Sequence, residues 1–332
     1  MSKVVVITGA SAGVGRAIAR RFARDDDVCL GLIARGEAGL TATAEEVTKL
    51  GARALVLPCD VSDAAAVDDA ATRAEAEFGP IDIWINNAMT AVLGEVIDTS
   101  AEEFRRVMEV TFLGSVHGTQ AALRRMEPRD RGTIIQVGSA LGIRGIPLQA
   151  TYCAAKHAIQ GFFESLRTEL RHRGSAVHLG IVQLPGLNTT QFSWVRLHVP
   201  NEPQPVPPIY QPEVAAEAVY WAAHHRRREL WVGFPTVYTI LGSRIAPWLA
   251  EWYLARTGFK GQQTDKRAAP DRRDYLERPL DESEDHGFHG SFDDQAHGHS
   301  PQAWLARHRP GLGTIAGIGA AAVTATALLS RR

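Results

Sequence analysis

Tyr152 and Lys156, four residues apart, have the side-chain types and the spacing to move a proton. On a helix, residues at positions i and i+4 share one face, so the phenol and the ammonium group would lie side by side. A free tyrosine has a pKa of about 10 and is a poor base at neutral pH, but a nearby ammonium favours the phenolate and lowers that pKa. We therefore expect Tyr152 to exchange a proton with a substrate, although a tyrosine and a lysine also share a helix face by chance.

Ser139 is a third candidate for this chemistry. It lies 13 residues before Tyr152, just after a strand predicted over residues 133–137. A hydroxyl at the tip of a strand can donate a hydrogen bond to a substrate oxygen and hold that oxygen beside the phenol. We therefore predict that Ser139, Tyr152 and Lys156 form one catalytic centre, in which Ser139 orients the substrate.

A glycine-rich turn follows the first run of β-branched residues, 4–7, and precedes a helix predicted from Val14. Glycines at such a junction allow a tight turn and let backbone N–H groups approach a diphosphate at the helix N-terminus. The spacing is GxxxGxG rather than the GxGxxG fingerprint, and a turn that merely needs positive φ would also use glycine. Because of its position between strand and helix, we predict that it binds a dinucleotide through Gly9, Ser11, Ala12, Gly13, Val14 and Gly15.

The end of the second predicted strand, residues 28–34, bears on which dinucleotide binds. A carboxylate there accepts hydrogen bonds from the adenosine ribose, whereas an arginine accommodates a 2′-phosphate. Arg35 follows the strand and no acid stands at that end, so NADP(H) is favoured over NAD(H), unless Arg35 is only a solvated charge. Asp60, after the third strand, is expected to reach the adenine, and Asn87 and Ala88, after the fourth, to line the floor of the site.

Strands alternate with helices along most of the chain. Each apolar run that predicts a strand is followed by a stretch with helical spacing of apolar residues, and this alternation is typical of a doubly wound parallel sheet. The fold class is therefore α/β, a Rossmann-type single domain with a C-terminal extension. We predict strands over 4–7, 28–34, 54–57, 81–85, 133–137, 177–182 and near 230–232, and helices from 14 and over 40–50, 64–78, 101–126, 152–173 and 212–225.

Taken together, these motifs resemble the short-chain dehydrogenase/reductase family. The resemblance implies a nicotinamide cofactor, a tyrosine that acts as acid and base, a lysine that binds the nicotinamide ribose and lowers the tyrosine pKa, and a serine that orients the carbonyl. It also implies a homodimer or homotetramer. It rests on the turn 8–15, Asp60-Val61, Asn86-Asn87-Ala88, Ser139, Tyr152-Cys-Ala-Ala-Lys156 and Pro185-Gly186 over residues 3–235. The cofactor contacts that it adds are Val61, Tyr152, Lys156, Pro185, Gly186 and Thr189.

Two positions depart from the family pattern. Met89 stands where the family usually has glycine, and its side chain would crowd the cofactor cleft or require a small backbone shift. Thr111 stands where the family has an asparagine that holds a water in the proton relay. A threonine hydroxyl is shorter and cannot copy both contacts of an amide. We therefore expect Thr111 to belong to the catalytic centre with a rearranged relay.

Composition excludes several classes of protein. The chain has 332 residues, of which 45% are hydrophobic and 22% charged, so it is not wholly disordered, collagen-like or a polytopic membrane protein. Its net charge of -1 gives no reason to expect a nucleic-acid partner. Three scattered cysteines without a CxxC pair exclude a disulfide framework and a thiolate zinc site. Apolar sequence from residue 4 leaves no room for a secretory signal, so we expect a cytoplasmic protein.

The chain divides into a catalytic domain over residues 1–235, an extension over 236–309 and an apolar tail over 310–332. Within the tail, residues 311–329 carry no charge and contain a GxxxG pattern, so they are a candidate membrane anchor. Only six of these 19 residues are Ile, Leu or Val. A tail that is disordered or docks on a partner subunit is therefore the alternative.

Aromatic and aliphatic residues suggest what the substrate is like. Phe192, Trp194, Val195 and Leu197, with the stretch 231–252, suggest a bulky apolar small molecule, or equally a surface on which the extension packs. Helical spacing over 237–252 favours a lid or packing helix, ahead of a dimer surface or an interfacial membrane helix.

Residues 260–300 are polar and are not expected to have a core of their own. Four histidines over 286–299 lie among acidic residues there, but a solvated loop is commoner than a metal site and we predict no metal.

We therefore predict an NADP(H)-dependent oxidoreductase that interconverts a secondary alcohol and a ketone on a bulky, apolar substrate. The alternative is a non-catalytic protein of the same fold that senses the cofactor or acts as a scaffold. Only Met89 and Thr111 favour that alternative, because a silent site has no chemical need to keep Ser139, Tyr152 and Lys156 together.

Overall fold

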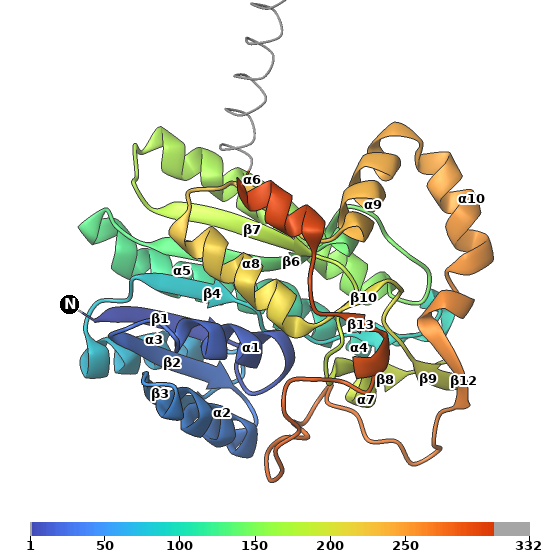
Figure 1. The fold of residues 1–332 in the computed structure, drawn as a ribbon, viewed down its shortest axis with the longest axis horizontal. Helices are drawn as coiled ribbons and strands as arrows, with labels where there is room; N and C mark the ends of the chain where they lie inside the picture. The colour runs from blue at the N-terminus through green and yellow to red at the C-terminus, as the bar shows by residue number, and fades with distance from the viewer. Residues whose placement is uncertain (1, 309–332) are drawn as a thin grey trace, which may run out of the picture.

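The computed structural model describes residues 2–308. A seven-stranded parallel sheet forms its centre (Figure 1). Its strand order is β11-β7-β6-β4-β1-β2-β3. The inner strands are buried along almost their whole length, as expected for a parallel sheet covered on both faces. The predicted doubly wound α/β fold is therefore confirmed. The strands are β1 Lys3–Thr8, β2 Val28–Ala34, β3 Arg53–Pro58, β4 Ile83–Asn86, β6 Thr133–Ser139, β7 His178–Leu184 and β11 Glu229–Trp231.

Helices cover both faces of the sheet, and each face has its own apolar cluster (Figure 1). On one face α1 Gly13–Phe22, α2 Glu37–Lys49 and α8 Pro212–His224 pack against the strands. The other face is covered by α3 Ala64–Phe78, α5 Gly114–Met126 and α6 Ala150–His172. These helices match the predicted ones within a few residues at most ends.

The predicted helix 101–126 is not continuous, and this expectation is corrected. It consists of α4 Ala101–Val107, a π-helical turn Met108–Leu113, and α5. Ser100 caps α4 through a capping box with Glu103, so the start of the segment is fixed by local sequence. A π-turn inserts an extra residue into the helical register, and such turns are frequent at functional sites. Here it contains Thr111.

The order of the strands places a crevice at the carboxyl end of the sheet. β1 lies between β2 and β4, so the chain leaves β1 towards one edge and later returns to its other side. At such a switch point the connections diverge, and ligands bind in the crevice outside the strand ends. Parallel pairing brings Thr8 next to Ile33, and the residues that follow β1, β2 and β4 therefore meet at this edge.

The C-terminal extension is threaded along the body instead of forming a separate unit (Figure 1). β12 Gln263–Arg267 pairs with β9 Asn201–Pro203, and β13 Ala296–His297 pairs with β10 Ile209–Tyr210. Residues 301–308 are helical and pack against the α8 side of the sheet through Ala303. The remaining short elements are β5 Val92–Leu93, α7 Gln191–Trp194 and β8 Arg196–Leu197, with 3-10 turns at Val96–Asp98, Glu127–Arg129, Ala140–Gly142, Lys260–Gln262 and Asp293–Gln295.

The predicted helix 237–252 is split in two. Proline interrupts it, giving α9 Phe234–Ile245 and α10 Pro247–Thr257. Only Thr236 and Ile240 of α9 are buried, and α10 buries no residue. The two helices therefore pack only slightly against the domain. Their exposed large side chains are Phe234, Tyr238, Leu241, Ile245, Trp248, Leu249, Trp252 and Tyr253.

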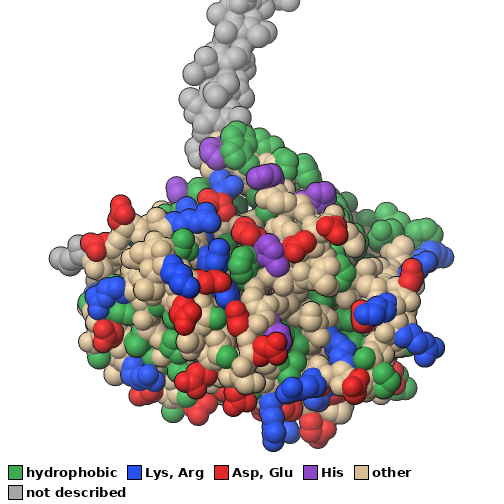
Figure 2. All heavy atoms as spheres, turned by 60° about the horizontal axis from the view of Figure 1, so that its bottom comes forward, with side chains coloured by type: hydrophobic (Ala, Val, Ile, Leu, Met, Phe, Trp, Pro, Cys, Tyr) green, Lys and Arg blue, Asp and Glu red, His purple; other side chains and the backbone are tan. Residues whose placement is uncertain are grey.

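Elsewhere on the surface, acidic and basic side chains are interspersed, as the face in Figure 2 shows. Over the part of the chain that the structure describes, no helix combines the length and the hydrophobicity that a membrane span needs. The candidate anchor at 311–329 lies outside the described residues.

Candidate active site

The glycine turn brings β1 and α1 very close together. Gly9 has a φ of +67°, in the left-handed region that favours glycine. A Cβ on Gly15 would lie only 2.0 Å from the carbonyl oxygen of Gly9, so no side chain fits there. The turn therefore presents its backbone, with little side-chain cover, at the N-terminus of α1, where an anion is favoured.

Asn87 fastens this turn to the end of β4. Its side-chain amide donates to the carbonyl oxygens of Thr8 (3.0 Å) and Gly9 (3.1 Å). The Thr8 hydroxyl in turn accepts hydrogen bonds from the backbone N–H groups of Asn87 (2.9 Å) and Ala88 (3.0 Å). The floor of the crevice is thus held by hydrogen bonds between neighbouring strand ends.

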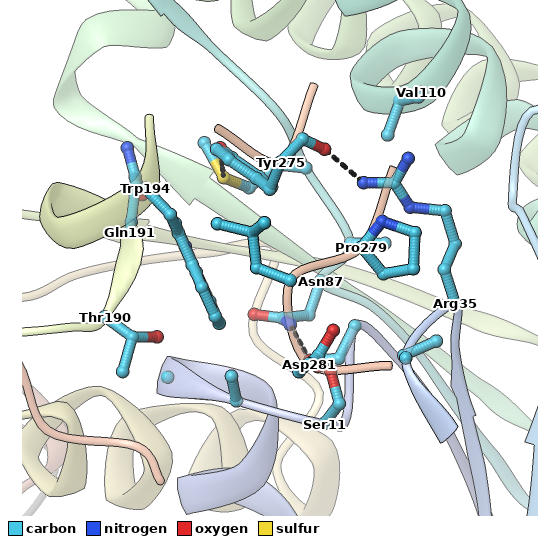
Figure 3. Close-up of a pocket in the computed structure, with 18 of the residues that line it drawn as sticks. Ser11, Arg35, Asn87, Val110, Thr190, Gln191, Trp194, Tyr275, Pro279 and Asp281 are labelled. Atoms are coloured by element: carbon cyan, nitrogen blue, oxygen red, sulfur yellow. Dashed lines mark hydrogen bonds between the residues drawn. The ribbon is translucent and has the colours of Figure 1, made fainter. Parts of the chain in front are cut away.

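A cavity of about 180 Å³ follows the carboxyl ends of β1, β2, β3 and β4 (Figure 3). It brings together most of the residues that the sequence analysis assigned to the cofactor. Gly15, Pro185 and Gly186 do not line it, and neither does the group Ser139, Tyr152 and Lys156. The predicted residues on its wall are Gly9, Ser11, Ala12, Gly13, Val14, Arg35, Asp60, Val61, Asn87, Ala88 and Thr189.

The outer wall of the cavity comes from a segment that the sequence analysis did not assign to any site. We call residues 274–285 the strap. Its residues Tyr275, Pro279, Leu280 and Asp281 line the cavity, opposite the glycine turn. The strap begins at α7, where the Tyr275 N–H donates to the Trp194 carbonyl oxygen (3.1 Å). Trp194, which the sequence did suggest, lines the cavity too, and its ring centroid lies 5.9 Å from that of Tyr275.

Arg35 lies in the cavity wall, but its guanidinium is bound by the strap (Figure 3). It donates to the backbone carbonyl oxygens of Leu276 (3.3 Å) and Glu277 (3.0 Å), and to that of Tyr275. Burial lowers the pKa of Arg35, while the nearby Asp60 and Asp281 carboxylates favour its charged form. The residue is therefore a half-buried cation whose partners are mostly main-chain oxygens.

Asp60 also has partners of its own. Arg106 donates to its carboxylate at 2.5 Å, and the Ser62 hydroxyl and N–H donate at 2.8 and 2.9 Å. Burial alone would raise the pKa of Asp60, but these hydrogen bonds hold it below its ordinary value. Arg106 donates as well to the Leu276 carbonyl oxygen (3.2 Å), so it links the strap to the end of β3.

The structure brings Ser139, Tyr152 and Lys156 together where β6 ends and α6 begins. The Ser139 side chain lies near enough to Tyr152 to lower its pKa. Lys156 is buried, its Nζ lies 5.5 Å from the centroid of the Tyr152 ring, and it donates to the Val137 carbonyl oxygen (2.8 Å). The helix thus places the two side chains on one face, as their spacing predicts.

Burial dominates the ionisation of this group. It raises the pKa of Tyr152, against the smaller opposing effect of the Ser139 side chain. It lowers the pKa of Lys156 to about 8, because its charge is removed from water. At neutral pH this arrangement favours a protonated phenol beside an ammonium group that is still mostly charged.

Thr111 and Met89 shape the loop that follows β4. The Thr111 hydroxyl donates to the Thr90 carbonyl oxygen (2.9 Å) and accepts from the Thr90 N–H (3.0 Å). Its single hydroxyl proton is therefore used by this loop. Met89 lines the cavity, and the Tyr275 hydroxyl donates to its Sδ at 3.8 Å. The Met89 side chain thus narrows the cleft and contacts the strap.

The histidines of the extension do not form a metal site in the structure. Among residues 2–308, no group of three His, Cys, Asp or Glu side chains is arranged to hold a metal ion. His289 lies between Glu213 and Asp293, each 3.0 Å away, and the His286 ring packs on Trp194.

Comparisons with known proteins agree with this geometry. The family model of the short chain dehydrogenases matches residues 3–197, which is more than half of the chain. The chain belongs to the short-chain dehydrogenase/reductase family. It is 30% identical over 270 residues to the uncharacterized oxidoreductase YxnA of Bacillus subtilis, covering 81% of this chain and 76% of that protein. It is also 39% identical to human dehydrogenase/reductase SDR family member 7, over 50% of each chain.

Two solved structures share the fold of this short-chain dehydrogenase/reductase. An alcohol dehydrogenase from Thermococcus sibiricus, complexed with 5-hydroxy-NADP, has a TM-score of 0.60 and 27% identity, and covers 70% of this chain and 96% of that one. A short-chain dehydrogenase/reductase from Burkholderia phymatum, in complex with NAD, has a TM-score of 0.66 and 26% identity, and covers 81% and 98%. The protein is therefore an oxidoreductase of a family that uses NAD(P).

Proposed function

We propose that the protein is an NADP(H)-dependent oxidoreductase that interconverts a secondary alcohol and a ketone on a bulky, apolar substrate. The observation that carries the proposal is the grouping of Ser139, Tyr152 and Lys156 beside the crevice. Proton exchange with a carbonyl oxygen needs a positioned acid and base, and a phenol paired with an ammonium group supplies one.

The residues present fit a dinucleotide cofactor. The glycine turn offers backbone N–H groups to a diphosphate and leaves no space for side chains, since a Cβ on Gly15 would strike the Gly9 carbonyl oxygen. Arg35 stands at the end of β2, where it can bind a 2′-phosphate, and this supports NADP(H). When bound, the nicotinamide supplies or accepts the hydride.

The protein's own side chains would handle the proton. In reduction, Tyr152 donates its proton to the oxygen of the carbonyl, and in oxidation it accepts one from the alcohol. The Ser139 hydroxyl, which lies beside Tyr152, orients the same oxygen. The Lys156 ammonium lies close enough to stabilise a phenolate on Tyr152. Thr111 contributes by holding the loop that carries Met89.

The walls near the catalytic end support an apolar substrate. Met89 and Trp194 line the cavity and Tyr275 lies between them, so the surface there is largely thioether and aromatic. Pockets with such walls and few polar groups bind apolar molecules. Assembly as a homodimer or homotetramer remains a prediction, to be checked by light scattering of the purified protein.

The test is a fluorescence titration with NADPH and NADH, followed by a panel of bulky ketones. We expect NADPH to bind at least tenfold more tightly than NADH, a difference of about 1.4 kcal/mol, and at least one ketone to be reduced. Tighter binding of NADH would contradict the cofactor preference. Binding of neither nucleotide would contradict the whole proposal.

A second candidate is a cofactor-binding protein without turnover. It is favoured by the cavity, which Ser139, Tyr152 and Lys156 do not line, and by Tyr275, which lies near enough to Tyr152 to raise its pKa. Tight NADPH binding without reduction of any ketone, in both the full chain and a Tyr275→Ala variant, would support this candidate over the first.

A further inference from the structure

The strap makes contacts that a cofactor would need to replace. Its residues Tyr275, Pro279 and Asp281 face the cavity (Figure 3). Leu276 anchors it by complete burial in a cluster with Val92, Val107 and Ala155. Two of the strap's contacts with the body bear on the cofactor, one with Arg35 and one with the first turn of α2. Both are positively polarised positions at the nucleotide end of the crevice.

The contact with Arg35 uses oxygens of the strap backbone. Three consecutive carbonyl groups, those of Tyr275, Leu276 and Glu277, accept hydrogen bonds from the guanidinium. An arginine with these partners has few donors left for a 2′-phosphate. The phosphate would therefore have to take the place of the strap at this residue.

The contact with α2 involves the carboxylate of Asp281. Its Oδ1 approaches Gly36 so closely that a Cβ there would lie 1.9 Å away, and its Oδ2 would be 2.7 Å from a Cβ on Gly39. The backbone carbonyl oxygen of Asp281 also accepts from the Gly39 N–H (3.1 Å). Asp281 is 7% exposed and lies close to Ser11. A buried carboxylate thus occupies the start of α2, beside the glycine turn.

The cavity that the strap walls is small. Sites for small molecules usually enclose roughly 300–1,000 Å³, and a dinucleotide is a large ligand. The cavity measures about 180 Å³ with the strap in place. The strap walls part of this space and binds Arg35, so a 2′-phosphate that pairs with Arg35 must displace that part of the strap.

We propose that Asp281 is a residue that determines cofactor specificity: it takes the place of the 2′-phosphate, so NADP(H) must expel it, whereas NAD(H) can be held with it in place. A carboxylate at the end of β2 normally accepts hydrogen bonds from the ribose hydroxyls of NAD. Arg35 and not an acid comes directly after β2, and the exposed Glu37 begins α2, whereas the strap brings the buried Asp281 to the end of β2. A 2′-phosphate and the Asp281 carboxylate repel each other because both carry negative charge, and both are attracted to the Arg35 cation.

This inference deepens the proposed function and rests on it. Cofactor binding is to be measured with the full chain, its Asp281→Asn variant and a Glu284→Gln control, each titrated with NADPH and NADH. The control removes one negative charge from an exposed position of the same strap. We expect Asp281→Asn to raise the ratio of NADPH to NADH affinity at least tenfold, about 1.4 kcal/mol, and Glu284→Gln to leave it within twofold.

Amide hydrogen exchange over 274–285 gives a second readout that does not depend on turnover. We expect saturating NADPH to speed exchange in the strap of the unmodified protein, and NADH to speed it less. An unchanged affinity ratio in Asp281→Asn, or a strap that NADPH protects, would overturn the inference while leaving the proposed function intact. If none of the three proteins bound either nucleotide, the proposed function itself would fail.

Discussion

The two walls of the crevice are built in different ways. The inner wall consists of strand ends and the turns that follow them, and its side chains bond to the next strand, as Asn87 does to Thr8 and Gly9. The outer wall is the strap, which comes from nearly 200 residues further along the chain and is held by Arg35, Arg106 and Arg16. The inner wall is therefore part of the sheet itself, whereas the outer wall is a separate segment that packs against the sheet.

The residues that can transfer a proton therefore lie apart from some of those that can control cofactor binding. The groups that can move a proton lie on the sheet side, at the end of β6 and on α6. The groups that can admit or exclude a cofactor lie on both sides, because Arg35 and Asp281 come from opposite walls. Changes in the inner wall should therefore affect catalysis and folding, and changes in the strap should affect binding.

The largest expected effect is on turnover, from Tyr152→Phe. Loss of the phenol proton removes the acid and base, and we expect the rate to fall by about 10²–10⁴-fold while NADPH binding is retained. Tyr275→Phe is the matched control, since it removes another buried phenol, which belongs to the strap and donates to Met89. A Tyr152→Phe protein with near-normal turnover would contradict the catalytic role of Tyr152.

Gly15→Ala tests the rigidity of the inner wall. The new Cβ would meet the Gly9 carbonyl oxygen at 2.0 Å, and such overpacking typically costs about 1–3 kcal/mol. We expect a lower free energy of unfolding in urea and weaker NADPH binding. Gly261→Ala is the control, because a Cβ there has no atom within 4 Å. Equal free energies of unfolding for the two variants would mean that the backbone of the turn shifts to accept the Cβ at little cost.

Lys156→Met tests what the buried ammonium costs the fold. Burial lowers the pKa of Lys156 from 10.5 to about 8, so between these values the unfolded chain binds more protons and stability rises with pH. We expect the variant to be more stable than the unmodified protein at pH 7, by about 1–3 kcal/mol, and this advantage to shrink towards pH 10. Urea unfolding at both pH values measures it.

Exposed Lys49→Met is the control for that experiment, and we expect no comparable pH dependence from it. A destabilised Lys156→Met protein at pH 7 would show that the hydrogen bond to Val137 outweighs the cost of burying the charge.

The smallest effect is expected from Asp285→Asn in the strap. Arg16 holds the pKa of Asp285 below its ordinary value, although burial alone would raise it, and also binds Glu46. Since Asp285 is partly exposed, its loss should cost less than about 1 kcal/mol. We expect faster amide exchange over 274–285 at pH 7, with exposed Asp271→Asn as the control.

The pH dependence of this contact has a definite sign. The stabilisation is present above the ordinary carboxyl pKa of about 4 and is lost as the pH falls through the lower pKa of the folded state. The difference in melting temperature between the unmodified protein and Asp285→Asn should therefore vanish in acid. A difference that grew in acid would contradict the ion pair.

The inner wall could be predicted from sequence because its residues follow strands at short, fixed distances. Gly9, Asp60 and Asn87 each follow the end of an apolar run within three residues, and parallel pairing brings such positions to one edge. The interruption of the helix 101–126 could not be foreseen, since a π-turn leaves no clear mark in the spacing of Thr111 and its neighbours.

The strap could not be predicted for a different reason. Residues 274–285 have neither periodicity nor a motif, and their position depends on contacts with residues about 240 or more positions earlier in the sequence, such as Arg35 and Gly39. Leu276 is fully buried in the structure, but an isolated leucine in a polar stretch does not indicate a docked segment. Contacts between residues far apart in the sequence determine where such a segment lies, whereas sequence patterns report only on local structure.

The way in which the strap holds Arg35 has a consequence for how this protein can change in evolution. Every amino acid has a backbone carbonyl group, so substitutions at 275–277 leave the three acceptors of Arg35 in place. Insertion or deletion of one residue between 274 and 281 would instead shift those carbonyls out of register with Asp281. Selection acting on this contact would conserve the length of the strap more strictly than its residues. Relatives that hold this arginine in the same way need not share the sequence of the strap.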